Sequence, residues 1–330
     1  MKTRTLHTLG NVLGKARSDH HHTARMVERQ RRGQDIDRCT KLHKIYLSIS
    51  GTNVAKIRYI CDMKLKANCK INLGLDILRR REDGFHDLET VMIPVTELYD
   101  VITVERAEVV ELVQTGIVVD CPPETNLCLR AYNLVRSRYD VPPVRITLDK
   151  RVPFGAGLGG GSSDASTVIL AINEEFNLGL SVQEMVDMAA ALGSDTAFFI
   201  ENRVQLCTGR GEIMRPIDLD LKGLWMVVIK PPFGISTAEA YSGVRPAVPA
   251  RTLVERLSDD RSTWQEQIVN GFEPHIFAAH PRLAELKQTL LNAGALYAAM
   301  SGSGSALFGL FESKPEVEFA DDVFVHTQQL

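Results

Sequence analysis

Apolar and polar residues alternate along residues 65–77, which is the period of a β-strand. One face of this strand is apolar throughout. The opposite face carries Lys70 and Asn72 side by side, because residues two apart in a strand point the same way. Taken alone, such a polar face is typical of a solvated antiparallel strand.

The same reading predicts further elements along the chain. Asp83-Gly84 indicates a turn after the first strand, and Ser181 with Glu184 forms a capping box that opens a helix closed by Gly193. Strands are expected at residues 86–95, 101–104, 109–113, 117–119, 144–149, 224–229, 296–300 and 306–311, and helices at 126–139, 236–241, 252–257 and 281–293. Short strands alternating with helices predict an α+β protein of two domains, residues 63–222 and 223–330.

A glycine-rich loop precedes another predicted helix. It reads Pro153, Phe154, Gly155, Ala156, Gly157, Leu158, Gly159, Gly160, Gly161, Ser162, Ser163, and apolar residues then recur at helical spacing over 165–176, with Gly179 placed to stop the helix. Glycines allow close approach of backbone N–H groups, and the start of a helix adds unpaired donors and a positive dipole end. The loop therefore predicts an anion site, typically for phosphate.

Two common nucleotide motifs do not account for this loop. Gly155-x-Gly157-x-x-Gly160 fits the dinucleotide template, but residues 150–153 separate it from the preceding strand and no acid lies at the tip of a following strand. A Walker motif does not occur in the sequence. A flexible turn packed against a neighbour is the structural alternative.

Composition is that of a soluble globular protein, with 44% hydrophobic and 24% charged residues in 330. No run of about 18 apolar residues and no signal peptide occurs, and the six cysteines show no metal spacing. We therefore expect free thiols, no membrane or nucleic-acid partner, and a reducing cytoplasmic location.

Charge separates the first 62 residues from the rest. Residues 1–62 hold 13 Lys/Arg and 5 Asp/Glu, a net +8, whereas residues 63–330 carry −11. This basic extension has no sustained apolar period, and we expect it to lie outside the core. Three interpretations compete: a transit peptide, which would imply a plastid, a nucleic-acid-binding arm, or upstream sequence translated ahead of a true start at Met63. We favour the last, because acidic residues spoil the transit pattern and no aromatic interleaving supports base stacking.

Two further features complete the pattern. Asp195 follows Gly193 at the start of an apolar segment, where a helix N-cap is the structural alternative to a chemical role. A second glycine loop, residues 301–305, joins the strands at 296–300 and 306–311, and it again offers backbone donors without bulk.

Together, the Lys on the first strand, the Pro-x-x-x-Gly-Leu-Gly-Gly-Gly-Ser-Ser loop and the late Gly-Ser-Gly-Ser loop resemble the GHMP family of small-molecule kinases. The segments that begin at Ala67, Asp83, Asn126, Pro153 and Leu192 are similar to motifs of the branch that phosphorylates 4-diphosphocytidyl-2-C-methyl-D-erythritol. The similarity spans about residues 63–312 in order. It implies an N-terminal domain like ribosomal protein S5, a ferredoxin-like C-terminal domain, and an active site in the cleft between them.

The resemblance also implies roles for individual residues. Lys70 and Asp195 match the catalytic pair, and residues 153–163 match the triphosphate loop. Asn126 and Lys150 correspond to contacts around the nucleotide base and sugar. The substrate positions are Asn72, Phe85, His86, Thr237 and Tyr241, with Phe85 where a Tyr is common. Asp164 replaces an Asn of some relatives and is left out of the site, since a carboxylate near phosphates is repulsive unless it points away or caps the helix.

The implied reaction is ATP-dependent phosphorylation of the substrate's 2-hydroxyl on the non-mevalonate isoprenoid route, by a monomer or homodimer. Such a step needs a carboxylate to accept the hydroxyl proton and donors to hold the spreading phosphate charge, which suits Asp195, Lys70 and the glycine loop. Mg²⁺ is expected on the ATP phosphates, with Ser162 as a candidate hydroxyl ligand. The alternatives are a kinase for homoserine, mevalonate or a sugar, which lacks the Asp-Gly-Phe-His segment, and a binding module that has lost the chemistry.

Overall fold

The computed structural model describes residues 64–119 and 121–330. The predictions of a basic extension over residues 1–62 and of a start at Met63 concern residues outside these ranges.

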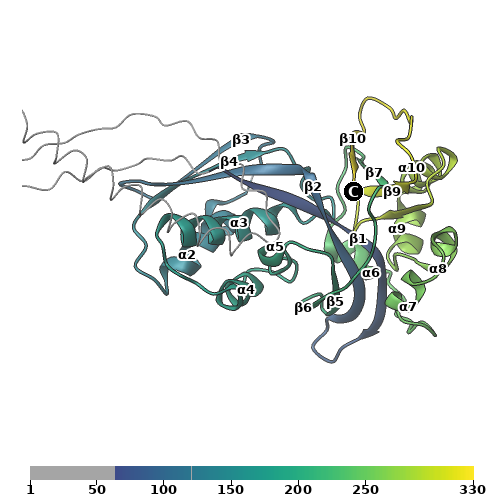
Figure 1. Ribbon diagram of the computed structural model, residues 1–330, viewed down its shortest axis with the longest axis horizontal. Coiled ribbons are helices and arrows are strands. Elements are labelled where there is room, and N and C mark those ends of the chain that lie inside the picture. Colours follow the sequence, from purple (N-terminus) through teal and green to yellow (C-terminus); the bar gives the residue numbers. More distant parts are fainter. Residues whose placement is uncertain (1–63, 120) are drawn as a thin grey trace, which may run out of the picture. The chain divides into compact units, whose positions relative to one another are not determined.

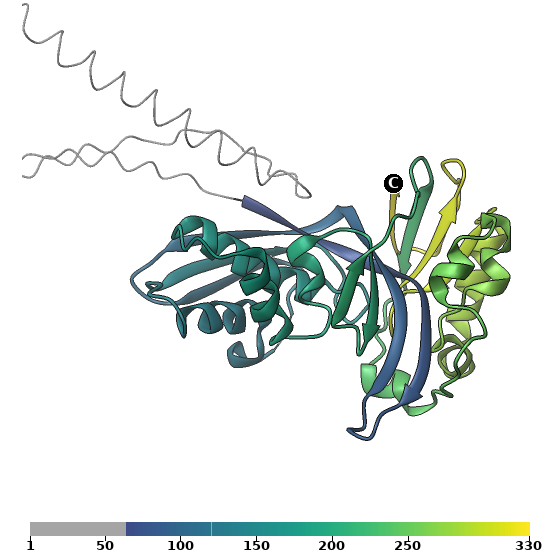
Figure 2. The same cartoon turned by 60° about the horizontal axis from the view of Figure 1, so that its bottom comes forward.

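The first of two sheets is built around two long antiparallel strands (Figures 1 and 2). Its strand order is β3-β4-β2-β5-β6, with β1 paired along β2, and only β3 and β4 run parallel. The strands are β1 (Lys64–Arg80), β2 (His86–Arg106), β3 (Glu111–Gly116), β4 (Val144–Lys150), β5 (Gln205–Gly209) and β6 (Ile213–Pro216).

The strand predicted at residues 65–77 is confirmed as part of β1. Both faces of β1 are buried, however, and not the apolar face alone. Lys70 and Asn72, expected on a polar face, are each 2% exposed. The ladder with β2 shifts register at three places, one of them between Leu73 and Leu75, where Gly74 takes a φ of +68°. A bulge of this kind bends a strand and redirects its groups, and it is common beside active sites.

Several predicted strand limits were wrong. Residues 86–95 and 101–104 belong to the single strand β2, residues 117–119 are not in a strand, and β5 and β6 were not predicted. The strands that were missed have five and four residues and mix polar with apolar positions, so alternation gives a weak signal.

Helices cover one face of this sheet (Figure 1). Asn126 caps α2 by accepting from the Cys128 N–H, and the predicted capping box of Ser181 and Glu184 opens α4. A core that includes Ala131, Val168 and Met188 fills the space between helices and strands. The elements are η1 (Pro123–Thr125), α2 (Leu127–Arg136), α3 (Gly160–Glu175), α4 (Val182–Ala190) and α5 (Phe198–Glu201).

The second sheet has the strand order β10-β7-β9-β8 and is antiparallel throughout. Its strands are β7 (Trp225–Lys230), β8 (Tyr297–Met300), β9 (Leu307–Phe311) and β10 (Phe324–Gln329). The helical elements are α6 (Thr237–Ser242), α7 (Leu253–Leu257), η2 (Arg261–Thr263), α8 (Trp264–Gln267), α9 (Glu273–Ala279) and α10 (Pro281–Asn292). Sequence periodicity missed η2, α8, α9 and β10, which are short or partly polar.

One hydrophobic core joins the two sheets. Ile71 and Leu73 of β1 pack in the same cluster as Met226 and Phe308 of the second sheet. The predicted domain boundary after residue 222 falls between β6 and β7, at the change from one sheet to the other. The two halves therefore meet over an extended apolar contact.

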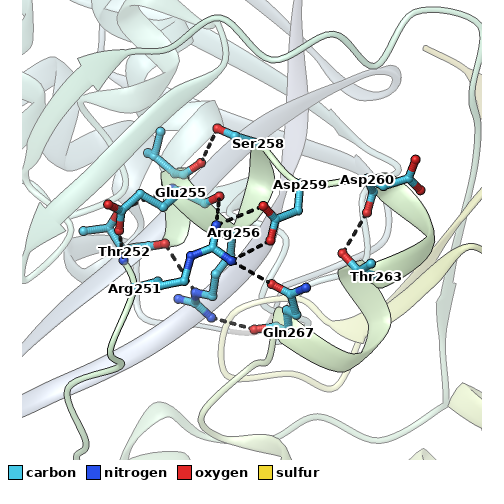
Figure 3. Close-up of polar contacts among 10 residues, drawn as sticks. Arg251, Thr252, Glu255, Arg256, Ser258, Asp259, Asp260, Thr263 and Gln267 are labelled. Carbon is cyan, nitrogen blue, oxygen red and sulfur yellow. Dashed lines mark hydrogen bonds and ion pairs between the residues drawn. The ribbon is translucent and has the colours of Figure 1, made fainter.

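The segment of α7 and α8 covers the bulge of β1. Leu253 of α7 packs so closely on Gly74 that a Cβ there would lie 2.6 Å from the Leu253 Cδ1 atom. Figure 3 shows how the segment is held: Thr252 and Glu255 form a capping box, Arg251 donates to Asp259, and Arg256 donates to the Gln267 carbonyl. Arg256 also pairs with the buried Asp76 of β1.

Candidate active site

A cavity of about 770 Å³ lies where the two halves meet. Most of the residues predicted for the site line it together, from both halves of the chain. They are Lys70, Asn72, Phe85, His86, Pro153, Phe154, Gly155, Ala156, Gly157, Leu158, Gly159, Gly160, Gly161, Ser162, Asp195, Thr237 and Tyr241. The second glycine loop joins them through Gly302, Ser303 and Gly304.

The glycine loop is held in a conformation that only glycine adopts easily. Gly155, Gly157 and Gly159 have φ values of +62°, +73° and +70°. A Cβ on Gly157 would lie 2.0 Å from the carbonyl oxygen of Ser301, so the loop also needs this glycine for its approach to the second loop. The Ala306 N–H donates to the Ala156 carbonyl and ties the two loops together.

Helix α3 begins directly at the cavity. Its N-cap is Gly159, and no side chain caps this end. The N–H groups of the first turn have no intrahelical partner, and the cavity wall contains Gly160, Gly161 and Ser162 of that turn. The N-terminal end of a 16-residue helix thus faces the cavity with its dipole, which favours a phosphate there.

Lys70 and Asp195 form an ion pair in the cavity wall, with 3.2 Å between Lys70 Nζ and Asp195 Oδ2. Lys70 Nζ also donates to Asn72 Oδ1 at 2.6 Å and to the Gly157 carbonyl at 2.8 Å. The lysine is buried, whereas about a third of the Asp195 side chain (35%) is exposed. The pair therefore presents its carboxylate to the cavity.

The alternative reading of Asp195 as an N-cap is wrong. Helix α5 begins at Phe198 after Ala197, and no side chain caps it. The turn that carries Asp195 is instead fixed from α3, because Ser166 Oγ donates to the Thr196 carbonyl at 2.6 Å. The carboxylate is left to interact with Lys70.

Aromatic rings form another wall of the cavity. His86 stacks on Tyr241 with ring centroids 4.9 Å apart and an interplanar angle of 23°, and Phe272 meets Tyr241 edge-on. Phe85 is 54% exposed, and the Arg210 guanidinium lies 4.9 Å from its ring centroid. Burial, and then the charge of Arg80, lower the pKa of His86, so its imidazole is neutral at pH 7 and offers one donor and one acceptor.

Three predicted site residues do not line the cavity. Lys150 is buried in ion pairs with Asp100 and Asp164, so the structure corrects its expected role as a free nucleotide contact. Asn126 is the buried cap of α2, and Ser163 is buried in the first turn of α3. Asp164 points away from the cavity, as its exclusion from the site required.

The cavity wall also contains residues that the sequence did not single out. Arg210, next to Gly211, follows β5, a strand that was not predicted, and Thr90 lies inside β2. Phe272 immediately precedes the unpredicted α9. Arg210 and Phe272 were missed because the elements beside them were not predicted, whereas Thr90 lies in the predicted strand at residues 86–95 but belongs to no motif.

Within residues 64–119 and 121–330, no group of three or more His, Cys, Asp or Glu side chains could hold a metal ion. Over the same residues no helix has the length and apolar character to cross a bilayer. Of the six cysteines, the four in the described part of the chain, Cys69, Cys121, Cys128 and Cys207, are free thiols, as predicted.

Comparison with known families defines the class of protein. Residues 126–203 match the GHMP kinases N terminal domain, and residues 251–323 match the GHMP kinases C terminal domain. The first match contains the glycine loop and Asp195, and the second contains Phe272 and the second glycine loop. The protein is a small-molecule kinase with the GHMP fold.

Curated relatives narrow this class. A 4-diphosphocytidyl-2-C-methyl-D-erythritol kinase of Parabacteroides distasonis is 44% identical over 269 residues, which cover 80% of this chain and 98% of that protein. The enzyme of the same name from Porphyromonas gingivalis is 42% identical over 257 residues, covering 77% and 93%. The chain belongs to the 4-diphosphocytidyl-2-C-methyl-D-erythritol kinase family.

Solved structures agree with this placement. A crystal structure of 4-(cytidine 5'-diphospho)-2C-methyl-D-erythritol kinase is similar with a TM-score of 0.63 and 34% identity, over 75% of this chain and 90% of that one. A homoserine kinase from Cytophaga hutchinsonii has a TM-score of 0.57 at 17% identity, over 83% and 97%. The second likeness is one of fold alone.

Proposed function

We propose that this protein transfers the γ-phosphoryl group of ATP to the 2-hydroxyl of 4-diphosphocytidyl-2-C-methyl-D-erythritol, on the non-mevalonate route to isoprenoid precursors. The observation that carries the proposal is the ion pair of Lys70 and Asp195 in the wall of the cavity. The same cavity is lined by the N-terminal end of α3, which suits a phosphate, and by an aromatic wall that includes His86 and Tyr241. The names of the relatives supply the substrate.

Asp195 acts as the base in this proposal. The substrate hydroxyl attacks the γ-phosphorus, the bond from that phosphorus to the β–γ bridging oxygen breaks, and ADP leaves with the bond's electron pair. The hydroxyl proton passes to the Asp195 carboxylate, which is partly exposed and within reach of a ligand in the cavity. Lys70 orients this carboxylate and adds positive charge beside the transferring group.

ATP binds with its phosphates at the glycine loop. The N–H groups at the start of α3 meet the β- and γ-phosphate oxygens, and the positive φ values of Gly155, Gly157 and Gly159 let the loop backbone approach them closely. Because the described residues hold no carboxylate cluster, Mg²⁺ fits here as an ion carried by the phosphates, with Ser162 as the hydroxyl at the cavity that could reach it. When bound, it neutralises charge on the phosphates.

The cytidylyl group is the handle by which the alcohol is held. Phe85 and the Tyr241–His86 stack offer aromatic surface for the cytosine ring, and neutral His86 can donate one hydrogen bond and accept one at the base edge. Arg210, whose guanidinium lies over Phe85, brings a cation to this wall, where a nucleotide diphosphate requires one.

The alternatives fit the site less well. A kinase for homoserine, mevalonate or a sugar has no use for an aromatic wall with a neutral histidine. A binding module that has lost the chemistry would lack Lys70, Asp195 or the glycines, but all of these are present and line the cavity.

The experiment that tests the proposal measures ADP release with the cytidylyl substrate, homoserine, mevalonate and galactose. We expect the cytidylyl substrate to exceed each of the others by more than about a hundredfold in kcat/KM, because sites built to pair polar groups reject molecules that lack them. Comparable or higher turnover of another alcohol would exclude the proposed substrate.

Phe85→Ala should raise the KM for the cytidylyl substrate about tenfold, because one stacking contact with the base is lost. A change in the KM for ATP alone would show that the aromatic wall is misassigned.

A further inference from the structure

The orientation of Lys70 depends on three acceptors. An ammonium group has three N–H donors, and here they meet Asn72 Oδ1 at 2.6 Å, the Gly157 carbonyl at 2.8 Å and Asp195 Oδ2 at 3.2 Å. The contact with Asn72 is the shortest of the three. The direction in which Lys70 points therefore depends on which way the Asn72 amide faces.

An asparagine amide has an oxygen that accepts and an NH₂ group that donates. If the Asn72 amide turned over, its NH₂ group would face the Lys70 ammonium, two donors would oppose each other, and the contact would be lost. Asn72 is 2% exposed, so water has little access to correct such a mismatch. Some other group must fix the amide.

Thr90 of β2 supplies that group. Asn72 Nδ2 donates to Thr90 Oγ1 at 3.1 Å, and Thr90 Oγ1 donates its own hydrogen to the Gly74 carbonyl at 2.6 Å. A hydroxyl has one hydrogen, and because Gly74 takes it, Thr90 can only accept from Asn72. The chain of hydrogen bonds has one possible direction, and it ends with the Asn72 oxygen facing Lys70.

The acceptor at Gly74 exists because of the bulge in β1. The ladder pairs Leu73 with Val91 and Leu75 with Thr90, so Gly74 is left out of the pairing. Its φ of +68° and its close contact with Leu253 permit only glycine there. The carbonyl freed from the ladder accepts the Thr90 hydrogen.

We propose that Thr90 is a positioning residue for phosphoryl transfer: through the Asn72 amide, its hydroxyl fixes the direction in which Lys70 presents its charge to Asp195 and the transferring phosphate. This inference rests on the proposed function of Lys70 and Asp195. Thr90 acts through Asn72 and needs no contact with the reacting atoms. Loss of its hydroxyl slows the chemical step and leaves both substrates bound as before.

The test compares Thr90→Val, which keeps the shape but removes the hydroxyl, with Thr90→Ser, which keeps the hydroxyl. We expect Thr90→Val to lower kcat about tenfold, with the KM for ATP and for the cytidylyl substrate within about twofold, since small errors of placement cost rate. Thr90→Ser should keep at least about half of the wild-type kcat. Thr103→Val, on the same strand and outside the cavity wall, is the matched control and should leave kcat unchanged.

Three results would overturn the inference: a Thr90→Val kcat within about twofold of wild type, a Thr90→Ser variant as slow as Thr90→Val, or a raised substrate KM with normal kcat, which indicates direct contact with the ligand. If Thr90→Val folds poorly, a double-mutant cycle provides the test. In an Asn72→Ala background, adding Thr90→Val should not lower kcat further, because the amide that Thr90 orients is absent. A further tenfold loss of kcat in the double variant would contradict the proposal. Asp195→Asn in the same assay separates this inference from the proposed function: if Asp195→Asn is slow while Thr90→Val is normal, only the role of Thr90 fails.

Discussion

Two buried lysines lie on either side of the glycine loop, and their surroundings differ. Lys70 has one carboxylate partner, Asp195, which is 35% exposed in the cavity wall. Lys150 has two, Asp100 and Asp164, and their side chains are only 0% and 3% exposed. The first has a partner that faces the cavity, as its proposed role requires, whereas the second lies among buried partners at the ends of the loop.

The contacts of Asp100 show how the second arrangement works. Its Oδ1 accepts from the N–H groups of Arg151 and Val152, at the start of the loop, and its Oδ2 pairs with Lys150. Lys150 then pairs with Asp164 of α3, just beyond the far end of the loop. One buried cluster therefore ties both ends of residues 153–163 together. A lysine is available for chemistry when its partner opens on a cavity, and it is structural when all its partners are buried.

The largest effect that separates the two lysines is one of stability. Lys150→Met leaves two carboxylates in the core without their cation, and we expect a loss of about 3–5 kcal/mol in the free energy of unfolding. Lys70→Met should cost less, about 2 kcal/mol, because water in the cavity can solvate Asp195, although the buried Asn72 oxygen loses its donor. Chemical denaturation of the two variants and the wild type gives both values.

Equal losses in the two variants would remove the distinction. If Lys150→Met proves insoluble, Lys150→Met combined with Asp164→Asn provides a second measurement. It removes one of the two buried carboxyl groups that have lost their cation and should recover part of the lost stability.

The next largest effect is on kcat. We expect it for substitution of Asp195, the partner of Lys70, and not for substitution of Asp164, a partner of Lys150. Asp195→Asn removes the proposed proton acceptor but keeps the side chain's shape, so we expect kcat to fall by about a hundredfold or more with ATP affinity nearly unchanged. Asp164→Asn, at the second lysine, should leave kcat within about threefold, since Asp100 still pairs with Lys150. Steady-state kinetics and nucleotide titration measure both. Unchanged turnover in Asp195→Asn would remove this residue from the mechanism.

Much of the fold could be predicted because its signals are local. The alternation of β1, the capping box of α4 and the apolar face of α3 each lie within one short window, and each predicted the right element. The limits of β2 could not be read in this way, because residues 96–100, which join the two predicted strands, include polar residues, and Tyr99 and Asp100 among them pair with β1. Pairing across the sheet, rather than local periodicity, keeps those residues extended.

The site residues also differ in whether local sequence signals could identify them. The motifs placed Lys70, Asp195 and the glycine loop correctly in one cavity. They could not separate Lys150 from Lys70, because the deciding partner, Asp100, lies 50 residues from Lys150 in the sequence. Thr90 was missed for a similar reason: its partner Gly74 accepts a hydrogen bond only because of a bulge, which no motif records.

The smallest expected effect is a pH dependence of stability that belongs to the second lysine's cluster. Burial raises the pKa of the Asp164 carboxyl to about 8, although Lys150 opposes the shift. Burial alone would lower the pKa of Lys150, but Asp164 and Asp100 outweigh it, so the lysine stays charged throughout this range. Because Asp164 binds its proton more tightly in the folded state than in the unfolded state, its contribution to stability is complete below pH 4 and is lost as the pH rises to about 8.

Between pH 6 and pH 8.5 we therefore expect the wild type to lose about 3–5 °C in Tm relative to Asp164→Asn, which cannot titrate there. The comparison between the two proteins matters, because Asp76 and Glu89, whose pKa values are also raised by burial, contribute equally to both. Asp187→Asn on the exposed face of α4 is the control and should follow the wild type at every pH. Parallel Tm curves for the wild type and Asp164→Asn would show that the carboxyl is ionised across this range. The cluster would then hold a net negative charge beside helix α3, and Lys150 would have to stabilise two ionised carboxylates at once.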